Sequence, residues 1–167
     1  MFFTARLIQG LTAAGIDVTV ADHHWWSVGK SIPRTKWLRT PSLAGNPDGY
    51  LATLIRELRS QPYDMLLPTF EESLLLAEFR DEVESLTFLP LAPFDVMCRL
   101  HHKPSLYDLC SELRIPTPPT VPRPHPREME REFSVLRFPV VLKLPTSNNS
   151  LGREYCDTMP QLLERIR

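Results

Sequence analysis

The sequence predicts an α/β fold in which a parallel sheet carries helices on its faces, and three observations indicate this class. Helix-like and strand-like patterns alternate through residues 1–100, as expected of parallel strands joined by crossover helices. The strand-like runs are short and are apolar or β-branched. The chain is 43% apolar and 23% charged, which is ordinary for a globular protein. Its 167 residues suffice for one domain, or for one domain and part of a second.

The first domain is predicted at residues 1–100. Its elements, in order, are a helix at 2–14, a strand at 16–22, an irregular segment at 23–46, a helix at 47–59, a strand at 65–68, a helix at 71–86, a strand at 87–89 and a short helix at 93–100. Gly15 stops the first helix, the alternation in IDVTVAD favours a strand, and Pro47 suits a first helical turn. Because doubly wound folds begin with a strand and a glycine-rich turn, the leading helix predicts that the first strand is missing or comes later in the chain.

The second domain is predicted at residues 101–167, and its pattern looks unfinished. A helix begins near Lys103, and a proline-rich connector at 116–126 leads to a charged helix at 127–134. Strands follow at 139–144 and 153–156, and a last helix begins near Thr158. We therefore expect a domain that is truncated at Arg167.

The overall composition excludes several classes of function. The net charge of −1 favours neither a nucleic-acid nor a membrane partner, and no apolar run is long enough for a membrane span. The three cysteines, Cys98, Cys110 and Cys156, lack C-x-x-C spacing, so we predict reduced thiols in a cytoplasmic protein and no zinc site. The adjacent histidines at 23–24 and 101–102 point opposite ways on an extended chain, and we predict no metal site there.

A lysine and a polar loop follow the strand of the second domain. FPVVLKLPTSNNSLG, residues 138–152, places Lys143 after an apolar run and then offers hydroxyls, amides and a glycine. Loops with free backbone N–H groups beside a lysine hold phosphate oxygens. The plainer interpretation is that Lys143 reaches solvent from a buried strand and that the loop is a hairpin. The spacing alone favours neither, and the Walker pattern G-x-x-x-x-G-K-[ST] is absent.

Lys103 is the second candidate cation. It lies in LHHKPSLYDLCSELRIPTPPT, residues 100–120, at the start of a predicted helix. A cation in the first turn is mildly unfavourable against the helix dipole. A nearby anionic ligand would account for it, and the alternative is an ordinary solvated lysine.

These motifs together resemble the start of an ATP-grasp domain. LHHK, a helix, RIPTPPT, FPVVLK and SNNSLG follow one another in the order typical of that superfamily. LLPTFEESLLLA, residues 66–77, is similar to the PT-x-E-E segment of carbamoyl-phosphate-synthase-like members. The match spans most of the chain. It implies a Rossmann-like pre-ATP-grasp domain at 1–100, lacking its first strand, and the first part of an α+β ATP-grasp domain at 101–167.

The resemblance implies an ATP site. Lys103 would be the first lysine to contact ATP, near its phosphate end, and Lys143 would approach the α- and β-phosphates. The residues that would fold over the β- and γ-phosphates are Ser147, Asn148, Asn149, Ser150 and Gly152. Asn148 and Asn149 stand where relatives often have glycine.

A weaker substrate-binding prediction concerns the first domain. Glu71 and Glu72 follow a predicted strand, at the sheet edge where open α/β folds bind ligands; their alternative interpretation, as a helix start, is favoured. Ser31 and Arg34 lie where relatives often carry a Ser-Arg pair, which hints at carboxylate binding. Trp25 and Trp26 either pack against this segment or line a substrate pocket, and packing is favoured.

The family reaction joins a small carboxylate to an amine. The carboxylate attacks the γ-phosphate of ATP to give an acyl phosphate, and an amine or other nucleophile then displaces the phosphate. No catalytic residue is predicted in this chain, and the Mg²⁺ ligands are expected beyond residue 167, so the chain alone should be inactive.

The sequence leaves two alternative classes of protein and predicts one partner. A noncatalytic α/β binding or interaction module is the main alternative, and a dinucleotide-dependent oxidoreductase is disfavoured because no G-x-G-x-x-G is present. The unfinished second domain should expose apolar faces. We therefore predict a homo-oligomer that associates through residues 138–167.

Overall fold

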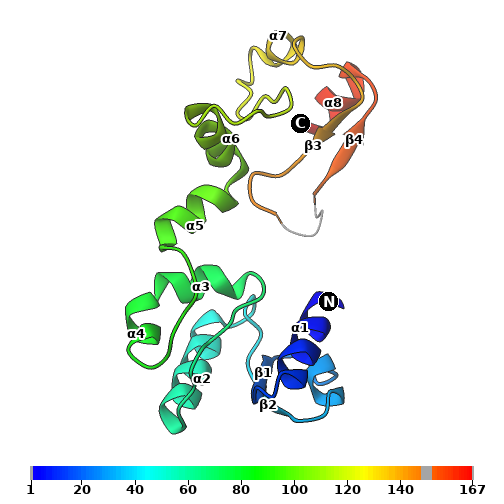
Figure 1. Cartoon of the computed structure of the whole chain (residues 1–167). Helices are drawn as coiled ribbons and strands as arrows, with labels where there is room; N and C mark the ends of the chain where they lie inside the picture. The colour runs from blue at the N-terminus through cyan, green and yellow to red at the C-terminus, as the bar shows by residue number, and fades with distance from the viewer. Residues whose placement is uncertain (1, 148–151, 167) are drawn as a thin grey trace. The chain divides into compact units, whose positions relative to one another are not determined.

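The computed structural model describes residues 2–147 and 152–166 and shows a mixed α/β structure (Figure 1). The chain divides into two compact units, Met1–Phe94 and Asp95–Arg167. The division lies at the start of a short helix, α5 (Phe94–His101), whereas the sequence predicts a boundary after it. Within the described ranges, no helix is both long enough and apolar enough to cross a membrane.

The first unit contains helices and a small parallel sheet. Its elements are α1 (Phe2–Ala13), β1 (Val18–Asp22), the 3-10 helix η1 (Val28–Ser31), β2 (Thr35–Arg39), α2 (Pro47–Ser60), α3 (Glu72–Glu78) and α4 (Arg80–Glu84). The helices predicted at 2–14 and 47–59 are confirmed. The Asn46 side chain caps α2 by accepting a hydrogen bond from the Gly49 N–H at 2.9 Å, and Pro47 lies in the first turn.

The sheet pairs a predicted strand with one that the sequence analysis missed. β1 runs parallel to β2, in register from Val18 opposite Thr35 to Asp22 opposite Arg39. The prediction of irregular chain throughout 23–46 is therefore wrong. TKWLR has two cations among its five residues and follows the turn at Pro33, so its strand pattern is weak.

The strands predicted at 65–68 and 87–89 are wrong in extent. The structure retains one parallel bridge, between Met65 and Phe88, with the Leu66 N–H donating to the Phe88 carbonyl at 3.0 Å. Pro68 and Pro90 follow closely. Because proline has no N–H for a ladder, neither segment extends into a full strand.

The buried core of the first unit comes mainly from α2, α3 and α4. Its buried members are Leu51, Leu54, Ile55, Leu58, Leu76, Val83 and Leu89. The single helix predicted at 71–86 is two helices, because Phe79 leaves helical geometry (φ −100°, ψ 30°) between α3 and α4. Arg80, which begins α4, donates a hydrogen bond to the Ala92 carbonyl at 2.9 Å. No proline or glycine marks this break in the sequence.

Tyr63 links three parts of the first unit. Its hydroxyl donates to Glu57 Oε1 of α2 at 2.7 Å and lies 3.2 Å from Thr19 Oγ1 of β1. The Tyr63 carbonyl accepts a hydrogen bond from Thr87 Oγ1 at 2.7 Å. The bond from Tyr63, with a second from Gln61, lowers the pKa of the Glu57 carboxyl below its ordinary value of 4.5. Burial raises the pKa of the Tyr63 hydroxyl.

Tyr63→Phe is expected to reduce the free energy of unfolding by about 1 kcal/mol at pH 7, the usual net value of one hydrogen bond. A carboxyl whose pKa is depressed by folding stabilises the fold above its unfolded pKa, and this stabilisation is lost as the pH falls through the folded pKa. The difference between wild type and variant should therefore shrink below about pH 4. Urea unfolding of the wild type and the variant, at pH 7 and below about pH 4, measures this difference in the free energy of unfolding. Tyr107→Phe is the control. An equal difference at both pH values would contradict the role of ionised Glu57.

The second unit places a two-stranded antiparallel sheet beside short helices (Figure 1). Its further elements are α6 (Lys103–Glu112), α7 (Met129–Phe133), β3 (Val140–Leu142), β4 (Glu154–Cys156) and α8 (Met159–Ile166). Phe133, Cys156 and Leu162 form its buried core. The strands predicted at 139–144 and 153–156 and the helix predicted from Thr158 are confirmed, with shorter bounds.

Candidate functional site

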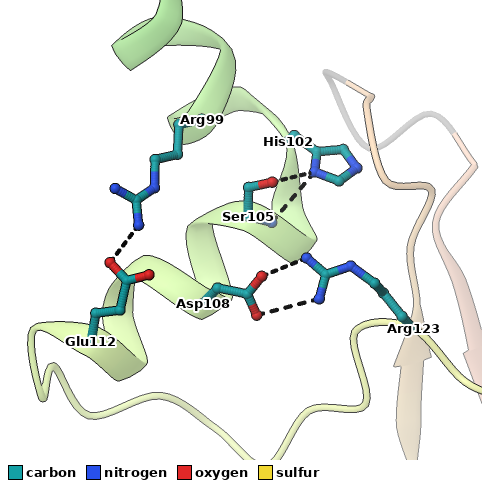
Figure 2. Close-up of polar contacts among 6 residues, drawn as sticks. All are labelled: Arg99, His102, Ser105, Asp108, Glu112 and Arg123. Atoms are coloured by element: carbon teal, nitrogen blue, oxygen red, sulfur yellow. Dashed lines mark hydrogen bonds and ion pairs between the residues drawn. The ribbon is translucent and has the colours of Figure 1, made fainter.

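The first feature of the candidate site is the N-terminus of α6. His102 is its N-cap: the Ser105 N–H donates to His102 Nδ1 at 3.4 Å and the Ser105 hydroxyl lies 2.7 Å from the same nitrogen (Figure 2). Nδ1 can accept only when the ring is neutral with its proton on Nε2. Pro104 is buried in the first turn, where proline fits a helix. These features fix Lys103 as the first helical residue.

Lys103 is bonded to the segment that follows β3. Its backbone N–H donates to the Pro145 carbonyl at 2.9 Å. Its ammonium donates to the Ser147 carbonyl at 3.1 Å and to the Ser147 hydroxyl at 3.0 Å. The side chain is half-buried. Two predicted site residues from distant parts of the sequence are therefore brought into direct contact.

Lys143 lies at the root of the same segment, directly after β3. It is exposed, and in the part of the chain that the structure describes its ammonium makes no hydrogen bond or ion pair. The nearest acidic residue on β4, Glu154, is already paired with Arg165 of α8 at 2.6 Å. The exposure of Lys143 leaves its ammonium accessible from solvent.

Gly152 closes the segment on the β4 side. Its φ of +64° is in the left-handed region that favours glycine. A Cβ at this position would lie 2.3 Å from Leu144 Cδ1, so the two ends of the loop pack together. The backbone conformation favours glycine here, and any larger residue would also displace the Leu144 side chain. Asn148, Asn149 and Ser150, the other predicted loop residues, lie outside the described residues.

Ion pairs hold α6 to its surroundings (Figure 2). The Arg123 guanidinium binds both carboxylate oxygens of Asp108, which attaches the proline-rich connector to the helix. The hydrogen bond from Arg123 lowers the pKa of the Asp108 carboxyl. Arg99 of α5 pairs with Glu112 near the other end of α6. Because these ion pairs are exposed, each contributes little to the free energy of folding. Their main effect is on the orientation of α6.

The four weaker candidates, Glu71, Glu72, Ser31 and Arg34, all lie in the first unit. Glu72 Oε1 accepts hydrogen bonds from the N–H groups of Thr69 and Phe70 at 2.7 and 3.0 Å. Its carboxylate therefore closes the turn that leads into α3. Glu71 is the exposed N-cap residue of that helix. Ser31 ends η1, and Arg34 has a φ of 65° in the turn before β2; both are exposed.

Two structural features of these regions are not predicted by the sequence. The His102 cap carries no recognisable signal, because histidine is not among the preferred N-cap residues. In the first unit, the Lys30 ammonium lies 3.4 Å from the ring centroid of Trp37 and 4.0 Å from that of Trp25. No local pattern in the sequence relates Lys30 to Trp25. Their contact involves Trp37 of β2, a strand that the sequence does not predict.

Comparison with known proteins adds no family to this picture. No protein-family model matches the chain, and no curated protein matches it significantly. The resemblance to ATP-grasp proteins therefore rests on the motifs in the sequence, and the geometry around Lys103 is the observation that bears on it.

Proposed function

We propose that the chain binds the phosphates of ATP through Lys103, Lys143 and the segment after β3, as the N-terminal part of an ATP-grasp carboxylate–amine ligase. The observation that carries this proposal is the pair of hydrogen bonds from the Lys103 ammonium to Ser147. These bonds bring the start of α6, which carries Lys103, into contact with the segment that follows Lys143. The sequence alone shows only the order of these two regions along the chain.

The charges of the site suit phosphate oxygens. The Lys103 ammonium is bonded to two neutral oxygens of Ser147, and an anionic phosphate oxygen would form a stronger, charge-assisted bond with it. Lys143 is exposed and contributes a second cation. The hydroxyl of Ser147 and the backbone next to Gly152 supply the small polar groups that allow close approach of a ligand.

In the longer enzyme that we propose, these groups would hold the phosphates of ATP while the phosphoryl group is transferred. A substrate carboxylate attacks the γ-phosphorus, ADP leaves, and an amine then displaces phosphate from the acyl phosphate. The ammonium groups of Lys103 and Lys143 would stabilise the charge that develops on the transferring phosphoryl group. Within residues 2–147 and 152–166 there is no group of three or more His, Cys, Asp or Glu side chains suited to a metal ion.

Calorimetric titration of Mg-ATP tests the proposal. Lys143→Ala is expected to weaken binding about tenfold or more, because it removes a charge-assisted contact of roughly 1.5–3 kcal/mol. Lys36→Ala is the matched control, since Lys36 is also an exposed lysine of a strand but lies in β2 of the first unit. The titration should use this chain and any longer product of the same reading frame.

Three outcomes separate the alternatives. Binding that Lys143→Ala weakens and Lys36→Ala leaves intact supports the ATP site. Binding that is insensitive to Lys143→Ala would place the nucleotide elsewhere. An absence of binding by every form would favour the noncatalytic binding module and return Lys143 to the role of a solvated strand lysine.

A further inference from the structure

The β3–β4 hairpin covers a core on one face and leaves the other face bare. β3 and β4 are antiparallel, with Val141 opposite Tyr155. Cys156 is fully buried and Val140 and Leu142 pack against the core with it. Val141 and Tyr155 point the other way and are 42% and 65% exposed. An antiparallel pair of three-residue strands rarely stands alone, so this small sheet is suited to extension.

The two edges of this sheet differ. β3 is flanked by Pro139 and Pro145, which lack an N–H and therefore end a ladder of hydrogen bonds. The segment from Gly152 to Met159, which contains β4, has no proline. Proteins use proline to block edge pairing, and in this hairpin only the β3 edge carries that protection.

The residues around β4 are complementary to themselves. Arg153 and Tyr155 lie on the same face of the strand, because the Arg153 guanidinium is 5.3 Å from the Tyr155 ring centroid. Asp157 lies in the bend directly after β4 and has the same parity along the chain as these two residues. It is exposed. In an antiparallel pair of two β4 strands centred on Tyr155, Arg153 of one copy faces Asp157 of the other, and this happens twice.

We propose that a second copy of this chain pairs with the open edge of β4, in antiparallel register about Tyr155. The same patch is used by both copies, as a two-fold interface requires. Tyr155 then lies beside its own copy, and the two Arg153–Asp157 pairs flank it as cross-strand pairs of opposite charge. The Asp157 N–H already donates to Gln161 Oε1 at 2.8 Å, so at this end the carboxylate, and not the backbone, makes the contact.

The dimer makes one continuous antiparallel sheet from two hairpins. Because a two-fold axis relating antiparallel edge strands is perpendicular to the sheet, the buried faces of both hairpins lie on the same side. The exposed residues Val141 and Tyr155 of both copies then form one apolar strip on the other side. The proposal is independent of the nucleotide site, since it concerns the free chain without ATP.

Charge reversal tests this register. Sedimentation velocity over a range of concentrations should show a monomer–dimer equilibrium for the wild type. Arg153→Asp and Asp157→Arg each place like charges opposite each other twice, and each should raise the dimer dissociation constant about tenfold or more. The double variant restores opposite charges and should recover the wild-type constant to within about threefold. Arg127→Asp, an exposed position before α7, is the control.

The dimerisation of the three variants decides whether the proposed register is correct. Loss of dimer in both single variants with recovery in the double variant establishes the proposed register. A wild-type chain that is monomeric at every concentration overturns the proposal, and so does a dimer that persists in both single variants. Circular dichroism of the double variant shows whether it is folded; a folded double variant that remains monomeric also overturns it.

Discussion

Phe133→Ala is expected to lower the free energy of unfolding of the second unit by about 3–5 kcal/mol, the usual cost of removing a large buried aromatic side chain. Phe133 is 3% exposed and is the contribution of α7 to a core that it shares with Cys156 of β4 and Leu162 of α8. The cavity would lie between α7, β4 and α8. Since whole domains are stable by only about 5–15 kcal/mol, this loss should leave the second unit partly unfolded.

Chemical denaturation followed by circular dichroism measures this effect. Val135→Ala is the control, because Val135 is close in sequence but 67% exposed, and it should change the stability by no more than about 0.5 kcal/mol. Equal effects of the two substitutions would show that Phe133 does not organise the core. A large effect of Phe133→Ala should also weaken the proposed nucleotide binding, because Val140 and Leu142 of β3, which precedes the candidate segment, pack against the same core.

Lys103→Ala is expected to weaken Mg-ATP binding by about tenfold to a hundredfold, which corresponds to about 1.4–2.8 kcal/mol. The substitution removes a proposed phosphate ligand and also both hydrogen bonds from the ammonium to Ser147. The backbone bond from residue 103 to Pro145 remains. In the absence of ATP, amide hydrogens in the segment from Leu144 to Ser147 should therefore exchange faster in the variant, while those of β3 should be unchanged.

Ser147→Ala separates the two roles of Lys103. It removes the hydroxyl acceptor but keeps the carbonyl acceptor and the ammonium, so ATP affinity should fall by less than in Lys103→Ala. If Lys103→Ala accelerates exchange without changing the affinity for ATP, then Lys103 holds the loop but does not bind phosphate. The reverse pattern would show that the contact with Ser147 contributes little to the order of the segment.

The sequence was a good guide to elements that local chemistry specifies. α2 begins at a proline after an asparagine cap, and both are legible in the sequence. β2 was missed because TKWLR acquires its strand character from pairing with β1, and pairing partners are not local information. The break at Phe79 was missed for a related reason, since the Arg80 contacts that accompany it reach Leu91 and Ala92.

The candidate site divides in the same way. Lys143 and its loop were visible as a strand that ends in a cation and small polar residues, whereas the contact between Lys103 and Ser147 joins residues that no local pattern relates. Order along the chain suggested that they belong to one site, and only the fold of the second unit gives their distance. For Glu72 the bonds to Thr69 and Phe70 support the helix-start interpretation.

The tryptophans provide an optical signal that belongs to the first unit alone. All three tryptophans, Trp25, Trp26 and Trp37, lie in the first unit, and Lys30 lies over the rings of two of them. Emission excited selectively from tryptophan therefore follows the melting of residues 1–94 alone, while far-ultraviolet dichroism sees both units. Any interval between the two melting curves belongs to the second unit, where the lysines of the candidate ATP site lie.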